Sequence, residues 1–261
     1  SSDSRLSKDP PSAFEIMTTV AFLCIARGNR EIAVIEAGLG GRLDATNLLG
    51  DVRMTVFTAI GLDHEDILGQ GIEAIAREKY SVLRRGVPAV SAAGGALLDG
   101  LAAARAKKTG SPLAILGRDA KIASRISNIQ GSSFELSQNG FAPLRLSTPL
   151  LGEHQVDNAA LASLACLKLS RCWAGISAET VRRGLEKTSW PGRMERIPLS
   201  PPVLLDGAHN PHGAEALSRT LLTLWPGIRP VFVMAAMRDK DITEMLKALS
   251  RTHGELFCTE I

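Results

Sequence analysis

The sequence predicts an α/β protein with two domains that meet near residue 190. Short apolar runs rich in β-branched residues alternate with helix-like stretches, and loops rich in glycine and polar residues follow several of these runs. Such alternation is typical of parallel sheets covered by helices. Trp190-Pro191-Gly192 interrupts the pattern, so we expect a parallel-sheet domain over residues 1–189 and a smaller α/β domain over residues 190–261.

The first domain is expected to begin with a helix and to continue with a parallel sheet. Residues 14–27 form a helix-like apolar stretch, and Gly28 and Asn29 suit a helix C-terminus. The apolar run at 32–35 is typical of a buried parallel strand. Further strands are expected at 54–60, 87–91 and 112–116, separated by a helix at 71–85 and an alanine-rich helix that ends at about 108.

An antiparallel excursion is expected in the middle of the chain. Residues 121–150 alternate polar and apolar side chains, with turn signals at Gln130-Gly131 and Asn139-Gly140. Helices are then expected at 155–169 and 178–187. After residue 190, expected strands at 203–205, 231–235 and 256–258 alternate with helices at 214–224 and 242–249.

The composition is that of an ordinary globular protein, with 45% hydrophobic and 22% charged residues in 261. The net charge of +3 is small and its positive residues are scattered, which argues against nucleic-acid binding. No apolar run reaches the roughly 18 residues of a membrane span, and the polar N-terminus lacks a secretory signal. The four cysteines show neither C-x-x-C pairing nor zinc-ligand spacing. We therefore expect a cytoplasmic protein with free, buried thiols and no membrane partner.

The segment IAVIEAGLGGRLDATN at 32–47 is the strongest candidate for a binding loop. It places Glu36 at the carboxyl end of the expected strand, where ligands bind in open parallel sheets. Asp44 and Asn47 add polar groups to the same loop. Its glycines permit a sharp turn and a close approach to a ligand. On the spacing alone, a ligand loop and a tight turn are equally good interpretations, and the pattern is not G-x-G-x-x-G.

Two further candidates follow in TAIGLDHEDILG and IAREKYSVL. Asp63 and His64 come where the expected strand at 54–60 ends, and Lys79 lies on the following helix. Magnesium normally takes oxygen ligands, so His64 alone is better interpreted as a hydrogen-bonded loop histidine. Lys79 alone is better interpreted as a solvated lysine paired with an acid such as Glu78.

Three later segments also carry polar residues that could bind a ligand. Asn158 is expected in the first turn of its helix, and Arg193 at the domain junction offers a planar fork that suits phosphate or a structural ion pair. The segment VLLDGAHNPHG gathers four polar residues where a strand ends and a helix begins, namely Asp206, His209, Asn210 and His212. This crowding favours a functional loop, and the spacing of the two histidines argues against zinc.

Taken in order, GLGGRLDATN, GLDH, REK, PGR and DGAHNPH resemble the Mur-ligase superfamily, and specifically its folylpolyglutamate synthase/dihydrofolate synthase branch. The resemblance runs from about residue 14 to the end of the chain and is weakest across 95–150. It implies a Mur-ligase-like central ATPase domain at 1–189 and a Rossmann-like glutamate ligase domain at 190–261. It also implies a monomer that uses Mg²⁺ and ATP to join L-glutamate to the carboxylate of a folate or dihydropteroate through an acyl phosphate.

The resemblance assigns roles to individual residues. It implies that Glu36 and His64 are magnesium ligands and that Lys79 is carbamylated, which reverses the interpretation of His64 and Lys79 in isolation. It implies that His209 positions glutamate. Its remaining implications are a pterin-substrate site at Leu43, Asp44 and Ala45, and ATP contacts at Asn158, Arg193 and Asp206.

One departure from the family pattern leaves alternatives open. The chain contains no G-x-x-G-K-[ST] phosphate loop. We expect this loop before residue 1, further chain after residue 261, and no activity from this stretch alone. A cell-wall amino-acid ligase of the same superfamily is a second hypothesis. The segment LDATN after the double glycine favours a folate substrate instead. A non-catalytic pterin-binding remnant is a third, and the joint presence of Glu36, His64, Lys79, Arg193 and Asp206 argues against it.

Overall fold

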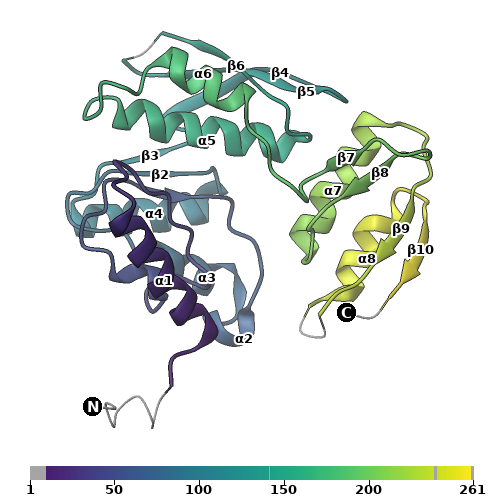
Figure 1. Cartoon of the computed structure of the whole chain (residues 1–261), viewed down its shortest axis with the longest axis horizontal. Coiled ribbons are helices and arrows are strands. Elements are labelled where there is room, and N and C mark those ends of the chain that lie inside the picture. The colour runs from purple at the N-terminus through teal and green to yellow at the C-terminus, as the bar shows by residue number, and fades with distance from the viewer. Residues whose placement is uncertain (1–9, 141, 238–239, 260–261) are drawn as a thin grey trace.

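A three-layer arrangement of helices on both faces of a parallel sheet forms the centre of the molecule (Figure 1). The computed structural model describes residues 10–140, 142–237 and 240–259. The sheet is parallel, with strands in the order β1 (Thr55–Phe57), β2 (Ala89–Ser91) and β3 (Leu113–Ile115). Helix α5 (Glu153–Leu169) packs on one face, and α3 (Gly71–Tyr80) and α4 (Gly95–Thr109) pack on the other.

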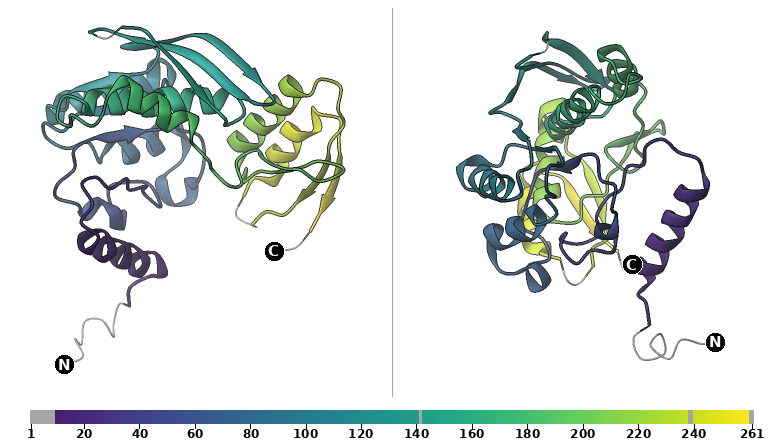
Figure 2. Two further views of the ribbon diagram at one scale, coloured as in Figure 1. Left: turned by 45° about the horizontal axis from the view of Figure 1, so that its top comes forward. Right: turned by 90° about the vertical axis from the view of Figure 1, so that its left-hand side faces the viewer.

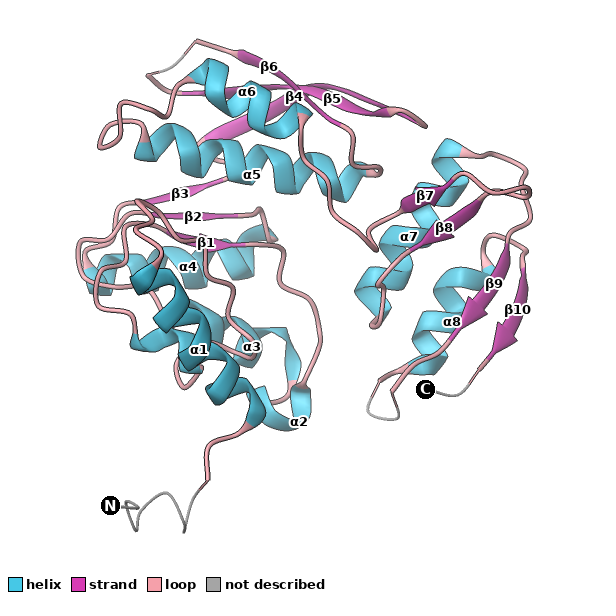
Figure 3. Ribbon diagram, in the orientation of Figure 1, coloured by secondary structure: helices cyan, strands magenta, loops and turns pink. Residues whose placement is uncertain are grey.

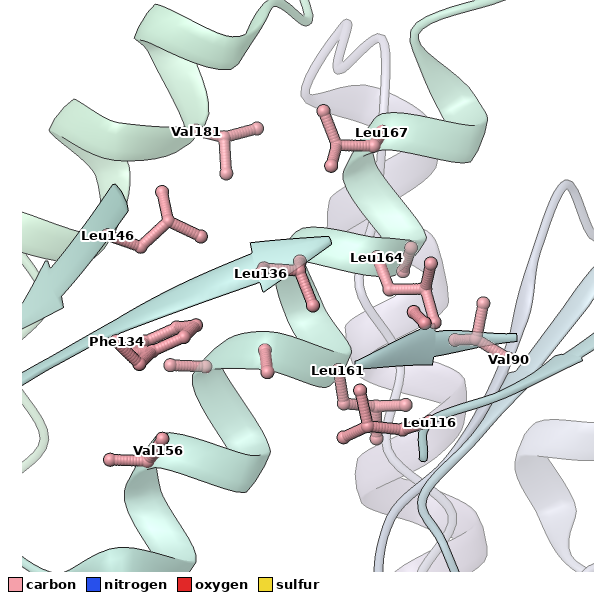
Figure 4. Close-up of a cluster of buried hydrophobic side chains, with 14 of the residues drawn as sticks. Val90, Leu116, Phe134, Leu136, Leu146, Val156, Leu161, Leu164, Leu167 and Val181 are labelled. Carbon is pink, nitrogen blue, oxygen red and sulfur yellow. The ribbon is translucent and has the colours of Figure 1, made fainter. Parts of the chain in front are cut away.

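Side-chain alternation along the strands connects the sheet to both helical layers. On β2, Ala89 packs into the cluster with α3 and α4, whereas Val90 packs into the cluster with α5. This is the period of two that a strand imposes on its side chains. Figure 4 shows Val90 and Leu116 beside Leu161 and Leu164 of α5. Both faces of β2 are thus buried, as the apolar composition of this strand predicts.

The expected antiparallel excursion is confirmed. Strands β4 (Ala120–Asn128), β5 (Gly131–Gln138) and β6 (Leu144–Thr148) form a meander whose two turns fall where the sequence signals them. The sheet packs on α5 and on α6 (Ala178–Glu186), with Phe134, Leu136 and Leu146 in the shared core (Figure 4).

The C-terminal part, which we define as residues 190–259, is also an α/β unit (Figure 3). Strands β9 (Val231–Met234) and β10 (Glu255–Cys258) are parallel, and helices α7 (Pro211–Leu224) and α8 (Ile242–Ser250) pack beside them. Strand β8 (Val203–Leu205) differs from the expected parallel units, because it pairs antiparallel with β7 (Glu195–Ile197). No strand was expected at β7, because its sequence Glu-Arg-Ile is not an apolar run.

Helix α1 (Ala13–Arg27) confirms the first expected helix and lies at the outer side of the N-terminal part, residues 10–189 (Figure 2). Ser12 and Glu15 form a capping box at its start, and Gly28 forms its C-cap. Thr18 is its one buried residue. Capping at the two ends therefore stabilises this helix more than burial of its side chains does.

The strand expected at 32–35 is wrong. These residues are extended but belong to no ladder, and Val34 is 95% exposed. A strand needs a hydrogen-bonded neighbour, and β1 pairs only with β2 among the described residues. The expected strand at 54–60 is correspondingly short, because only three of its residues have a partner in β2.

The cysteines correct a second expectation. All four are free, as predicted, but Cys24, Cys172 and Cys258 are exposed and Cys166 is half-buried.

Among the helices of the described ranges, none has the length and apolar content needed to cross a membrane.

Candidate functional site

The glycine-rich loop at 38–41 packs tightly against three neighbouring segments. A Cβ on Gly38 would collide with the ring of Phe14. A Cβ on Gly40 would lie 2.7 Å from Leu68 Cδ2, and Gly40 also has a φ of +65°. A Cβ on Gly41 would lie 2.7 Å from Val82 Cγ1. Close packing therefore explains these glycines without a ligand, which favours the tight-turn interpretation for them.

Asp44 fastens the same loop. It caps the 3-10 helix η1 (Ala45–Leu48), and its carboxylate accepts hydrogen bonds from the backbone N–H of Leu39 at 2.8 Å and of Thr46 at 2.9 Å. Burial acts to raise the pKa of Asp44, but the hydrogen bonds from Thr46 and Leu39 outweigh it and lower the pKa. Leu43 beside it is 79% exposed, and Ala45 is half-buried.

The two residues expected to bind magnesium lie on different segments. Glu36 is exposed on the extended segment that follows residue 31. His64 is half-buried ahead of the short helix α2 (Glu65–Leu68) and has a left-handed backbone, with φ 55° and ψ 38°. A non-glycine residue in this conformation is costly and clusters at functional sites. The described residues contain no group of three or more His, Cys, Asp or Glu side chains placed to hold a metal ion.

Lys79 lies half-buried near the end of α3. The expected pairing with Glu78 is wrong, because Glu78 accepts a hydrogen bond from the backbone N–H of Arg42 at 3.1 Å and also contacts the Arg42 guanidinium. Adjacent helical residues do not face each other. Glu78 therefore connects α3 to the glycine-rich loop.

Arg193 precedes β7 and Asp206 follows β8, so the two residues lie at the same end of this antiparallel pair. The Asp206 carboxylate accepts the backbone N–H of Met194 and of Ala208, both at 2.9 Å. The Arg193 guanidinium packs against Gly207, with Nη1 2.8 Å from where a Cβ would lie. Asp206 thus holds two loops in register. Asn158 is exposed in the second turn of α5 rather than the first, and its Nδ2 donates to Gln155 Oε1 at 3.3 Å.

The loop after β1 meets the C-terminal part at Asp63. The Asp63 carboxylate accepts hydrogen bonds from Asn210 Nδ2 at 2.8 Å and Lys240 Nζ at 3.2 Å. His209 Nε2 lies 3.9 Å from it, and His212 packs close to Gly61. Burial acts to raise the pKa of Asp63, but the bonds from Asn210 and Lys240 lower it below its ordinary value.

Sequence reasoning noticed Asp63 and Asn210 but gave them no role, and it missed Lys240. Asp63 is separated from Asn210 by 147 residues and from Lys240 by 177. No local pattern carries such a pairing. The available signal was that both loops follow strands in the sequence, since strand ends gather polar residues at one edge.

Comparison with known families identifies the two parts of the chain. The profile of the Mur ligase middle domain matches residues 10–166, and that of the Mur ligase glutamate ligase domain matches residues 192–260. The chain belongs to the Mur ligase family. The relatives to which this Mur ligase chain is similar include proteins named dihydrofolate synthase/folylpolyglutamate synthase.

The Mur ligase relatives are similar over nearly all of this chain. A dihydrofolate synthase/folylpolyglutamate synthase of Bacillus subtilis is 38% identical over 92% of the chain and 56% of the relative. One of Mycobacterium tuberculosis is 34% identical over 95% of the chain and 52% of the relative. The chain therefore spans about half the length of these curated relatives.

Solved structures give the same family. The Mycobacterium tuberculosis folylpolyglutamate synthase complexed with ADP superposes with a TM-score of 0.87 and 30% identity, over 98% of this chain and 58% of that one. An FPGS–AMPPCP–folate complex superposes with a TM-score of 0.85 and 28% identity, over 98% of this chain and 63% of that one. The expected α/β architecture of a Mur ligase is confirmed.

Proposed function

We propose that the protein containing this chain joins L-glutamate to the carboxylate of a folate or dihydropteroate at the expense of ATP. The observation that carries the proposal is the meeting of two loops at Asp63. Asp63 is bonded to Asn210 at 2.8 Å and lies next to both His64 and His209. Polar loops from the two parts of a Mur ligase thus face one another. The names of the relatives and the AMPPCP and folate in a similar structure support the substrates.

The proposed reaction has two steps. A carboxylate oxygen of the acceptor attacks the γ-phosphorus of ATP, which forms an acyl phosphate and releases ADP. The amine of L-glutamate then attacks the acyl carbon, loses a proton and expels inorganic phosphate, leaving an amide. Catalysis of such steps is mainly positioning and charge stabilisation, so a junction that brings two sets of polar groups together suits the chemistry.

The donor set fits a magnesium ion that arrives with nucleotide. Magnesium is usually held by one or two carboxylates, water and substrate phosphates rather than by a complete protein cage. Exposed Glu36 offers one such carboxylate and half-buried His64 adds a nitrogen ligand, and no cage of three acidic, His or Cys side chains occurs in the described residues. When bound, the ion would neutralise phosphate charge during transfer. Glu36 and His64 would fix its place.

Lys79 is proposed to be carbamylated. The Lys79 ammonium would first lose a proton. The neutral amine would then form an N–C bond with carbon dioxide and release a second proton, so that a cation becomes an anion. The half-buried Lys79 is available for this because Glu78 is engaged by Arg42. A ¹³C-bicarbonate NMR experiment is expected to show a carbamate carbon that disappears in Lys79→Arg. An unchanged spectrum in that variant would remove the assignment.

The remaining roles follow the two sides of the junction. Asn158, Arg193 and Asp206 are proposed to contact ATP, and His209 to orient the incoming glutamate. The substrate pterin is assigned to the loop with Leu43, Asp44 and Ala45, where the exposed Leu43 offers an apolar surface. We propose a monomer acting in the cytoplasm.

The test is ligase turnover by the protein in the full length that its gene encodes. ATP, Mg²⁺ and L-glutamate are supplied with dihydropteroate or tetrahydrofolate separately, and ADP release and the glutamylated product are measured. Turnover with one or both acceptors is expected. Glu36→Gln should lower it by about 100-fold or more, as for loss of a transition-state charge contact, and Glu31→Gln, at an exposed residue just before the same segment, should not. Turnover only with a nucleotide-sugar peptide would indicate a cell-wall ligase instead.

A further inference from the structure

Asp63 is the main polar connection between the two parts of the molecule. Three side-chain hydrogen bonds cross from residues 10–189 to residues 190–259 within the described ranges. Two of them, from Asn210 and Lys240, end on the Asp63 carboxylate. The third joins Arg196 to the backbone oxygen of Ile129 at 3.2 Å. The ion pairs that cross the same boundary between described residues also end on Asp63.

The partners of Asp63 lie at the start of both helices of the C-terminal part. Asn210 is the N-cap of α7, where its Oδ1 accepts the N–H of Gly213 at 2.8 Å while its Nδ2 donates to Asp63. Lys240 directly precedes Asp241, the N-cap of α8. A carboxylate near two helix N-termini is electrostatically favourable. One side chain therefore fixes the orientation of both helices.

The same carboxylate also organises His64. Asp63 Oδ1 accepts the backbone N–H of His64 at 3.0 Å, and the His64 ring lies 3.7 Å from it. His64 is in the left-handed conformation that only surrounding contacts can impose on a non-glycine residue. The geometry of His64 and the seating of α7 and α8 are thus linked through one residue.

The ion pair between Asp63 and Lys240 is less exposed than an ordinary surface ion pair, which makes it stronger. The Lys240 side chain is 11% exposed and that of Asp63 is 24% exposed. Hydrogen bonds to charged groups are stronger than neutral ones, and reduced exposure limits screening. Near this ion pair, His212 packs 3.3 Å from where a Cβ of Gly61 would lie, so the loop after β1 and the loop before α7 also fit closely.

We propose that Asp63 is a positioning residue that latches the C-terminal part onto the loop carrying His64. The latch sets the distance between the groups assigned above to the metal and those assigned to glutamate. The role of this latch in catalysis rests on the proposed function. Its effect on the orientation of the C-terminal part does not. Without the carboxylate, the C-terminal part should sample additional orientations while each part stays folded.

The experiment measures the distance between the two parts in the 261-residue chain. Spin labels are attached to exposed Cys172 and Cys258, with Cys24→Ser and Cys166→Ala in the background, and the distance distribution is recorded by pulsed electron resonance. We expect Asp63→Ala to reduce the population of the native distance by about tenfold, equivalent to about 1.4 kcal/mol. Asn210→Ala and Lys240→Met should broaden the distribution from the other side of the contact, and Lys240→Arg should restore it.

The matched control is Glu215→Gln. Glu215 pairs with Arg251 at 2.7 Å entirely within the C-terminal part, so its loss should leave the distribution unchanged. A wild-type distribution in Lys240→Met and Asp63→Ala would overturn the latch, as would equal broadening in Glu215→Gln. If Asp63→Ala does not fold by circular dichroism, Lys240→Met and Asn210→Ala decide. The measurement needs no turnover, so the latch and the ligase activity can fail separately.

Discussion

Helices α5 and α1 are both rich in apolar residues, yet their surroundings differ greatly. Nine residues of α5 are buried, and the helix lies between the parallel sheet and the antiparallel meander. In α1 only Thr18 is buried, and Met17, Val20 and Leu23 are half or more exposed. The extended segment that follows α1 is likewise exposed at Val34.

The difference shows that an apolar pattern predicts an element but not its neighbours. Around α5, neighbouring elements from several parts of the sequence complete the core, so the expected helices and strands occur, although the strands are shorter than the pattern indicates. Helix α1 has few burying neighbours and begins instead with a local device, the capping box of Ser12.

The largest expected difference between α5 and α1 is the loss of unfolding free energy when a leucine of each helix is truncated to alanine. Leu164 of α5 is fully buried, so Leu164→Ala should lower the free energy of unfolding by about 2–5 kcal/mol through lost burial and a cavity. Leu23 of α1 is 50% exposed, and Leu23→Ala should change the free energy of unfolding by less than about 0.5 kcal/mol. Urea unfolding followed by circular dichroism measures both. Equal losses would show that α1 is buried in solution.

A smaller effect is expected where the glycine-rich loop meets α3. Gly41→Ala would place a Cβ 2.7 Å from Val82 Cγ1 and 3.1 Å from the backbone oxygen of Glu78. The resulting overpacking should cost about 1–3 kcal/mol in the same unfolding experiment. Gly50→Ala is the control, because nothing lies within 4 Å of its Cβ position. A neutral Gly41→Ala would mean that this loop is not packed against α3.

The smallest effect is a local pH dependence at Asp44. Hydrogen bonds lower its pKa below the ordinary 3.8, so the ionised carboxylate stabilises the loop fully above that value. This contribution is lost as pH falls through the lowered pKa. Protection of the Leu39 and Thr46 amides, measured against the intrinsic exchange rate, should therefore fall at acid pH below 3.8, and Asp44→Asn should abolish that dependence. A loss of protection centred above 3.8 would contradict the hydrogen-bond assignment.

Much of the fold could be predicted from local sequence signals. The helix end at Gly28 and the turns at Gln130-Gly131 and Asn139-Gly140 mark elements that occur where expected. The failures have a common cause. Residues 32–35 lack a ladder partner, and β8 pairs with β7, whose sequence Glu-Arg-Ile is not an apolar run. Pairing depends on distant chain, which local patterns do not contain.

The candidate site divides in the same way. The ordered motifs identify the family, and the structure places Arg193 and Asp206 at the same end of the β7–β8 pair. The contact between Asp63 and Lys240 became visible only in three dimensions, because 177 residues separate them. The roles assigned to Glu36, His64 and Lys79 remain predictions that depend on bound substrates.

The measurement that tests the central claim most directly follows oxygen from the acceptor to phosphate. The full-length gene product is supplied with ATP, Mg²⁺, L-glutamate and dihydropteroate or tetrahydrofolate labelled with ¹⁸O in the reacting carboxylate, and the released phosphate is analysed by mass spectrometry. Ligation through an acyl phosphate predicts one labelled oxygen in each phosphate, together with ADP and the glutamyl amide. Unlabelled phosphate, AMP in place of ADP, or no amide with either acceptor would contradict the account.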